Sequence, residues 1–120
     1  MKYTKSHEWV DFIEEKKVRI GLSAHAVHQL GELVFVNLPE VDDELEAGES
    51  FGDAESIKAV SDIYSPVSGR VSAVNEEVLD NPALVNEAPE STWLIEVEEV
   101  SENEELLDEA EYKSFCESEA

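Results

Sequence analysis

Apolar residues in this chain occur in short segments, and no uninterrupted apolar stretch exceeds four residues. A helix that crosses a membrane needs roughly 20 such residues, so the pattern predicts no membrane span. Short segments rich in valine, isoleucine and aromatic residues that end at glycine, proline or charged turns are typical of β-strands. We therefore predict strands at 3–10, 17–22, 32–38, 60–64, 70–74 and 93–97.

Turn residues separate these predicted strands. The charged residues at 14–17 are expected to close a hairpin between the first two strands. Pro39 lacks a backbone donor and should end the third strand. Pro66 stands at the second position of a predicted type I turn at 65–69, and the Asn-Pro pair at 81–82 predicts a loop. These signals predict short strands that are joined by tight connections.

Two helices are predicted in addition to the strands. Ser23 can cap a short helix, and Gly31 stands where a left-handed residue would end it. Near the C-terminus, Ser101 and Glu104 have the spacing of a capping box, which predicts a second helix after them. We expect that helix to dock on the strands through a stripe of Leu106, Leu107 and Ala110.

The charge of the chain limits its partners. Eight Lys and Arg residues stand against thirty Asp and Glu residues, which gives a formal net charge of −22 over 120 residues. Such a surface repels phosphate backbones and anionic lipids, so neither nucleic acid nor membrane is an expected partner. The charge serves solubility or docking onto basic patches of other proteins. The length suits one compact domain, and we expect residues 1–120 to form a single domain.

The N-terminus and the cysteine content indicate a reducing compartment. Residues 1–8 have neither the apolar core of a secretory signal nor the Arg-rich, acid-poor character of a transit peptide. Cys116 is the only cysteine, so an internal disulfide is impossible. We expect a cytoplasmic protein, although a processed organellar form would have the same features.

No residue pattern of an enzyme is present. The chain lacks a Gly-rich phosphate loop, a His-Glu-x-x-His motif and a Gly-x-Ser-x-Gly motif. His25 and His28 lie three residues apart on the first predicted helix and could share a face, as metal ligands do. A nearby third ligand is missing, so we predict no metal site and no catalysis by the protein's own side chains.

Lys58 is the candidate residue for chemistry. It is the only basic residue between Arg19 and Arg70, and it interrupts two β segments. This position predicts a lone cation at a tight turn. On these grounds alone, the favoured interpretation of Lys58 is an ordinary exposed lysine that forms a weak surface pair with Glu55.

A family resemblance favours a specific role for this lysine. Residues 52–69 read G-x-x-E-S-I-K-A-V-S-D-I-Y-S-P-V-S-G, which resembles the lipoylation segment of glycine cleavage H proteins. Further similar segments follow the family order, at 7–10 (H-E-W-V), 34–39 (V-F-V-N-L-P) and 93–95 (W-L-I). Biotin carriers usually have methionine on both sides of the modified lysine, whereas this chain has isoleucine and alanine there. Lipoate is therefore favoured over biotin.

The resemblance implies a fold and a site. The fold would be mainly β, a barrel-sandwich hybrid of the lipoyl/biotinyl-carrier type with short helices and a C-terminal helix. Lys58 would lie at a hairpin tip and carry the covalent lipoyl group as N6-lipoyllysine. Glu8 and Asp62 match family positions that are associated with a cleft sheltering the loaded arm.

The resemblance also implies a function. The chain would be a non-catalytic carrier that shuttles an aminomethyl group from the pyridoxal-phosphate glycine decarboxylase (P protein) to the aminomethyltransferase (T protein). Dihydrolipoyl dehydrogenase (L protein) would reoxidise it, and a lipoyl ligase or lipoyltransferase would modify it. One alternative is an H-like relay that supplies lipoate to other 2-oxoacid dehydrogenase complexes. Another is an unmodified acidic interaction domain that has kept the fold.

Overall fold

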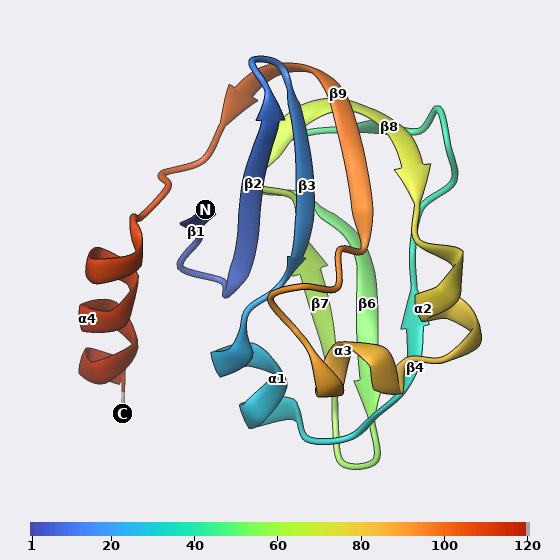
Figure 1. The fold of residues 1–120 in the computed structure, drawn as a ribbon, viewed down its shortest axis with the longest axis vertical. Helices are drawn as coiled ribbons and strands as arrows, with labels where there is room; N and C mark the ends of the chain where they lie inside the picture. The colour runs from blue at the N-terminus through green and yellow to red at the C-terminus, as the bar shows by residue number, and fades with distance from the viewer. Residues whose placement is uncertain (120) are drawn as a thin grey trace.

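The computed structural model describes residues 1–119, whose strands form two antiparallel sheets (Figure 1). The large sheet has the strand order β1-β2-β3-β9-β8-β5, and the small sheet has the order β4-β6-β7. The strands are β1 Lys2–Tyr3, β2 Glu8–Glu14, β3 Lys17–Leu22, β4 Leu33–Asn37, β5 Glu44–Leu45, β6 Ser50–Ser56, β7 Val60–Tyr64, β8 Val67–Val74 and β9 Ile95–Asn103. The helices are α1 Ala24–Leu30, α2 Glu76–Asp80, α3 Ala83–Glu87 and α4 Glu109–Glu119.

The two sheets share one hydrophobic core. Val10 and Ile20 of the large sheet belong to the same buried cluster as Val36, Ala54 and Ile63 of the small sheet. The alternation of side chains along a strand places these residues on the inward faces. The mainly β fold with short helices is therefore confirmed. No helix within residues 1–119 is both long and apolar enough to cross a membrane.

The predicted N-terminal hairpin is present, but its first strand differs from the prediction. The predicted strand at 3–10 is divided into β1 and β2, and β2 runs on to Glu14. A turn separates them, because the His7 N–H donates to the Thr4 carbonyl at 3.1 Å and His7 has a left-handed φ of 72°. The β2–β3 register pairs Val10 with Ile20. Both side chains therefore point into the core.

The first predicted helix and the strand after it are confirmed. The Ser23 hydroxyl accepts a hydrogen bond from the Ala26 N–H at 3.2 Å at the start of α1. Gly31 ends the helix with a φ of 84°. Strand β4 then ends before Pro39. The loop predicted at 81–82 is also present, but helices α2 and α3 flank it and were not predicted.

The predicted turn at 65–69 is wrong in its second half. Strand β8 already begins at Val67, which pairs with Asn103 of β9. The Ser65 hydroxyl donates to the Val67 carbonyl at 2.6 Å, so the change of direction is made before the strand. Pairing with β9 outweighs the local turn preference at Ser68 and Gly69, which both lie in the strand.

The predicted start of the C-terminal helix is also wrong. Ser101 lies in β9, which pairs with β8, and helix α4 begins only at Glu109. Its capping box consists of Asp108 and Glu111: the Glu111 N–H donates to Asp108 Oδ1 at 2.8 Å, and the Asp108 N–H donates to Glu111 Oε1 at 3.1 Å. The capping box predicted at Ser101 and Glu104 does not form, because the backbone at the end of β9 is already paired with β8.

Helix α4 docks through a different residue from those predicted. Leu106 and Leu107 precede the helix, Ala110 is exposed, and Tyr112 is its buried residue. The Tyr112 ring stacks on Tyr3 with ring centroids 4.3 Å apart. Together with Trp9 and Leu107, these two tyrosines form a second buried cluster. This cluster holds α4 against the edge of the large sheet (Figure 1).

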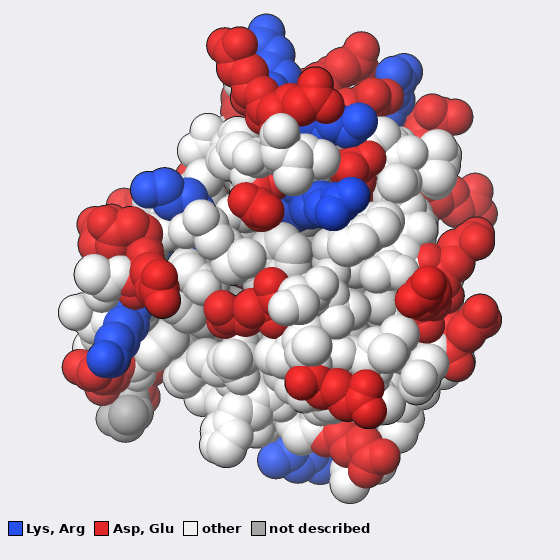
Figure 2. All heavy atoms as spheres, viewed as in Figure 1, with Lys and Arg blue, Asp and Glu red and all other residues white. Residues whose placement is uncertain are grey.

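The surface reflects the acidic composition. On the face shown in Figure 2, acidic side chains outnumber basic ones and extend around the rim of the molecule. Several basic side chains gather at the end that holds the β2–β3 turn. On this face the acidic charge is therefore spread out and not confined to one patch.

Candidate functional site

The connection between β6 and β7 presents Lys58 at a three-residue tip, residues 57–59. Glu55 and Val60 form the last registered pair of the hairpin. Beyond them, the Ser56 N–H donates to the Ala59 carbonyl at 2.8 Å. The strands flank Lys58 as predicted, and the tip projects from one end of the molecule beside the α1–β4 connection (Figure 1).

One buried serine fixes the backbone of this tip. The Ser56 hydroxyl oxygen accepts hydrogen bonds from the N–H groups of Lys58 at 3.3 Å and Ala59 at 3.1 Å. It also lies 3.2 Å from the Ala59 carbonyl oxygen, to which it can donate. Ser56 is 6% exposed, whereas its neighbour Ile57 is 74% exposed. The tip is thus held from inside while its own side chains face the solvent.

The Lys58 side chain is exposed and forms no ion pair. Within residues 1–119, the lysine and arginine ion pairs involve Lys5, Lys17, Arg19 and Arg70 only. An ordinary surface lysine was expected to pair with Glu55, and that ion pair is not found within residues 1–119. The Lys58 amine is therefore a free primary amine on a backbone that is held in place.

The tip rests on the end of α1. The Ile57 N–H donates to the Glu32 carbonyl at 3.4 Å. The Lys58 chain runs past Gly31, since a Cβ on Gly31 would lie 3.4 Å from Lys58 Cε and 3.8 Å from Nζ. The lysine therefore lies alongside the residue that ends the helix, and even a Cβ at Gly31 would make only an ordinary van der Waals contact with it.

Apolar side chains surround the tip on the outer face of the small sheet. Phe35 pairs with Glu55, and Glu55 pairs with Val60, so the three residues share one face. Phe35 is 55% exposed and Val60 is 62% exposed. Exposed apolar side chains that lie together are typical of a surface that other proteins contact.

A cleft of about 130 Å³ lies between α1, the start of β2 and β7, and both residues assigned to arm sheltering line it. Glu8 and Asp62 line this cleft together with Leu22, Leu30 and Ile63. Its wall is therefore partly apolar and its remaining groups are polar. Such a cleft can receive an alkyl chain that ends in a polar group.

Glu8 is a buried carboxylate in this wall. Its side chain is 1% exposed. Thr4 and Ser6 donate their hydroxyl groups to Oε1, the former at 2.7 Å, and the Tyr64 N–H donates to Oε2 at 3.3 Å. Burial raises the pKa of Glu8, and the hydrogen bonds oppose that rise. Glu8 thus lines a cleft, and its role in sheltering a loaded arm stays a prediction.

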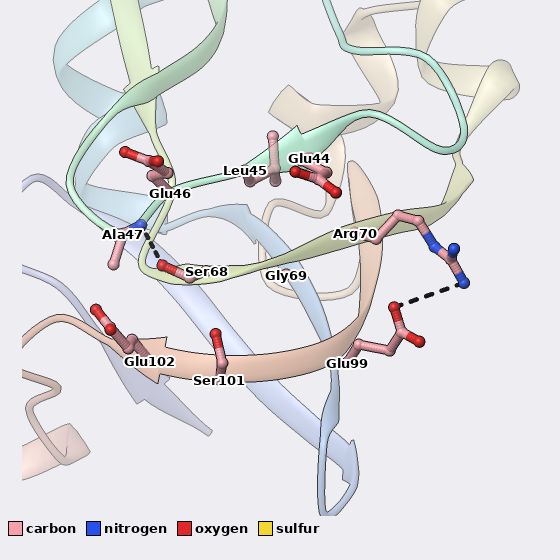
Figure 3. Close-up of a pocket in the computed structure, with 10 residues that line it drawn as sticks. All are labelled: Glu44, Leu45, Glu46, Ala47, Ser68, Gly69, Arg70, Glu99, Ser101 and Glu102. Atoms are coloured by element: carbon pink, nitrogen blue, oxygen red, sulfur yellow. Dashed lines mark hydrogen bonds and ion pairs between the residues drawn. The ribbon is translucent and has the colours of Figure 1, made fainter.

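A second hollow, of about 500 Å³, is lined by β5, β8 and the end of β9 (Figure 3). Glu44, Glu46, Glu99 and Glu102 line it, and the Arg70 guanidinium lies 3.6 Å from Glu99. Its carboxylates are exposed, and the hollow contains no residue of the Lys58 tip. Its chemistry is that of a solvated acidic surface.

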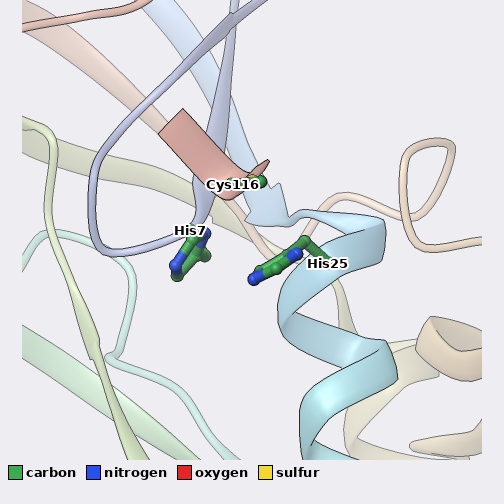
Figure 4. Close-up of side chains that lie close together, drawn as sticks. All are labelled: His7, His25 and Cys116. Atoms are coloured by element: carbon green, nitrogen blue, oxygen red, sulfur yellow. The ribbon is translucent and has the colours of Figure 1, made fainter. Parts of the chain in front are cut away.

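Only one of the two histidines on α1 belongs to a group of potential metal ligands. His28 is exposed, while His25 lies beside His7 and Cys116 (Figure 4). The three come from distant positions in the chain, so no spacing rule could have identified the cluster. Only the N-terminal turn, α1 and α4 in their folded arrangement bring it together.

Comparisons with known proteins agree with this architecture. The family described as "Glycine cleavage H-protein" matches residues 1–119. The glycine cleavage system H protein of Lachnoclostridium phytofermentans is 50% identical over 117 residues, which cover 98% of this chain and 92% of that protein. The one of Halalkalibacterium halodurans is 52% identical over 122 residues, covering 99% and 94%. The crystal structure of the Mycobacterium marinum protein superposes with a TM-score of 0.88 at 41% identity, covering 94% and 93%.

Proposed function

The chain belongs to the glycine cleavage H-protein family, a family of non-catalytic lipoyl carriers, and we propose that Lys58 is the residue that carries its lipoyl group. The observation that carries the proposal is the free Lys58 amine on a tip whose backbone Ser56 holds in place. The comparisons confirm two predictions from the sequence, namely membership in this family and the role of a carrier. A single carrier domain over residues 1–120 and a cytoplasmic location stay predictions.

The tip fits an acylated lysine. Amide formation at Nζ neutralises one positive charge, so the formal net charge changes from −22 to −23. No ion pair among residues 1–119 is broken by this change. The backbone bonds to Ser56 do not involve the Lys58 side chain and remain after modification. When bound, the lipoyl group supplies a disulfide that can be opened by reduction and a sulfur that can carry a one-carbon unit.

The cleft beside Glu8 and Asp62 is the proposed resting place of the arm. Asp62 follows Lys58 by four residues in sequence, mostly along β7, which places the two Cα atoms at most roughly 13 Å apart. Leu22, Leu30 and Ile63 offer apolar contacts to an alkyl chain. The carboxylates of Glu8 and Asp62 can accept hydrogen bonds from an amine at its end. Enclosure there would keep water away from the transported group.

The partners follow from the family. We propose that the chain docks in turn on glycine decarboxylase, aminomethyltransferase and dihydrolipoyl dehydrogenase, after a lipoyl ligase or lipoyltransferase has modified it. Short-lived docking suits a surface with a net charge of −22, since surface charge mainly speeds encounter and is screened by salt. We expect the KM of the decarboxylase for this carrier to rise with ionic strength. A KM that does not change between low and high salt would argue against electrostatic docking.

The experiment that tests the proposal is the intact mass of the chain after co-expression with a lipoate ligase and lipoate, followed by peptide mapping. We expect one lipoyl group, located on Lys58, in the wild-type chain. Lys58→Arg keeps the charge but offers no amine that can be acylated, so it should remain unmodified. Lys113→Arg, at an exposed lysine of α4, is the matched control and should be modified like the wild type. A folded wild-type chain that stays unmodified, or that is modified at another lysine, would overturn the assignment.

A further inference from the structure

Three side chains that commonly bind metals meet where three separate elements touch. His7 lies in the turn before β2, His25 on α1 and Cys116 on α4. One potential ligand atom of each lies within 4.8 Å of those of the other two. Figure 4 shows the two imidazole rings side by side, with Cys116 on the neighbouring helix. The site is separate from the Lys58 tip.

Within the described part of the chain, one histidine nitrogen of this cluster lacks a hydrogen-bond partner. The two rings have centroids 4.5 Å apart. The Nε2 atom of His25 is buried and has no hydrogen-bond partner among residues 1–119. Buried polar atoms without a partner are rare and call for an explanation such as a missing ion or water. An ion bound among the clustered side chains could supply that partner.

A carboxylate next to the cluster can complete the ligand set. Glu119 Oε1 lies 2.8 Å from His7 Nε2 and 3.9 Å from His25 Nε2. The distance to His25 is too long for a hydrogen bond. A tetrahedral zinc ion places neighbouring ligand atoms roughly 3.3 to 3.6 Å apart, given its usual bond lengths. Small side-chain movements would therefore bring all four groups to coordination distance.

We propose that His7, His25 and Cys116, with Glu119 as the fourth ligand, bind a divalent transition-metal ion of the zinc type. Two imidazoles, a thiolate and a carboxylate are a ligand set that Zn²⁺ accepts in tetrahedral geometry. Cys116 coordinates as the thiolate and releases its proton to the solvent on binding. The ion would serve as the partner that His25 Nε2 lacks among the described residues.

The surroundings orient one ligand in the manner of a metal site. His7 Nδ1 lies 2.7 Å from the Tyr112 hydroxyl oxygen, which in turn lies 2.6 Å from the Ser23 hydroxyl oxygen. A histidine that binds a metal usually gives its other ring N–H to such a partner, which fixes the ring and its tautomer. This contact leaves Nε2 of His7 as the ligand atom, on the side of Glu119.

Binding of the ion would connect three elements. It would link α4 to α1 and to the turn before β2, in addition to the packing of Tyr112 on Tyr3. His7 also lines the cleft of Glu8 and Asp62. The bound ion would therefore fix one side chain in the wall of that cleft. This inference does not depend on lipoylation of Lys58, and unmodified protein can be used to test it.

The test is a Co²⁺ titration of the full chain, after removal of any polyhistidine tag and treatment with a chelator. Tetrahedral Co²⁺ with a thiolate ligand has intense visible bands and a thiolate charge-transfer band in the near ultraviolet, which exposed carboxylates do not produce. We expect both sets of bands to saturate at one equivalent. We also expect Zn²⁺ to displace the Co²⁺ and to raise the melting temperature of the wild type. Absence of the bands in the folded wild type would overturn the proposal.

Variants separate this site from adventitious binding to the acidic surface. Cys116→Ser should remove the charge-transfer band, and His25→Gln should weaken Zn²⁺ binding, measured by competition with a chromophoric chelator, by at least about tenfold. His28→Gln, at an exposed position of the same helix, is the control and should bind like the wild type. Zn²⁺ binding that is unchanged by both Cys116→Ser and His25→Gln would overturn the proposal.

Glu119→Gln tests the fourth ligand without disturbing the core, since Glu119 is exposed. It should weaken Zn²⁺ binding and keep the charge-transfer band of Cys116. Should His25→Gln or Cys116→Ser fail to fold, as judged by circular dichroism, this variant still decides the question. Affinity for Zn²⁺ equal to that of the wild type would then overturn the four-ligand site.

Discussion

The Lys58 tip and the packing of Trp9 each depend on one small strand residue, but they use it in opposite ways. At the tip, the buried hydroxyl of Ser56 holds the backbone so that the next side chains project into solvent. In the hairpin of the large sheet, Gly21 has no side chain, so the indole of its pair partner Trp9 lies against its backbone and is 3% exposed. The first region presents the proposed lipoylation site, and the second stabilises the fold. Substitutions should therefore separate the two roles.

The largest effect on stability is expected from Gly21→Ala. A Cβ at this position would overlap the Trp9 ring, because it would lie much closer to the Cε2 atom than van der Waals contact allows. The indole cannot move freely, because its Nε1 donates to the Pro89 carbonyl at 2.9 Å. We expect a loss of about 1–3 kcal/mol in the free energy of unfolding, measured by urea titration. The folded fraction of Gly21→Ala should still be lipoylated at the wild-type level. Loss of lipoylation in folded protein would contradict the separate roles of the two regions.

A smaller effect is expected from Ser56→Ala, and it should include function. The substitution removes the acceptor of the Lys58 and Ala59 N–H groups, so we expect a loss of about 1 kcal/mol in the free energy of unfolding. The less ordered tip should be lipoylated more slowly, which a time course of intact mass can measure. Ser101→Ala, at an exposed serine of β9, is the control. Equal rates for Ser56→Ala and the wild type would show that the ligase does not require the held backbone.

The smallest effect is expected from Glu8→Gln, and it depends on pH. Burial raises the pKa of Glu8 in the folded state above its unfolded value. The folded state thus favours the protonated form of Glu8. This contribution to the free energy of unfolding is present at low pH and is lost as the pH rises through the folded pKa. Relative to Glu8→Gln, the wild type should become less stable as the pH rises above the unfolded pKa of a glutamate, about 4.3, as measured by urea midpoints.

The difference between wild type and variant is the relevant quantity, because the other carboxylates titrate in both proteins. Glu117→Gln, at an exposed position of α4, is the matched control for the loss of one carboxylate. A difference that favours the wild type more strongly at the higher pH would mean that the hydrogen bonds from Thr4, Ser6 and Tyr64 outweigh the effect of burial on the pKa of Glu8.

Local signals predicted the elements near the Lys58 tip well. Ser23 and Gly31 bound α1, β4 ends before Pro39, and strands flank Lys58, as the sequence indicates. These features depend on residues close together in the chain, such as a capping hydroxyl and its helix. They could therefore be predicted without knowledge of the rest of the fold.

Distant contacts explain where sequence reasoning failed. Ser101 and Glu104 have the capping spacing, but the pairing of β9 with β8 decides their conformation. The functioning capping box at Asp108 and Glu111 has the same kind of spacing and was overlooked. The cluster of His7, His25 and Cys116 has no sequence signal at all, because three elements bring it together.

The position of β9 has a consequence for how the chain is synthesised. This strand is the last of the chain, yet it lies between β3 and β8 in the large sheet. While the ribosome has not yet released residues 95–103, β3 and β8 each have an open edge that can pair with other chains. The nascent protein can form the β2–β3 and β6–β7 hairpins early, but it cannot close the large sheet until nearly the whole chain has emerged. Premature termination before Ile95 should thus yield an aggregating fragment in place of a shorter carrier.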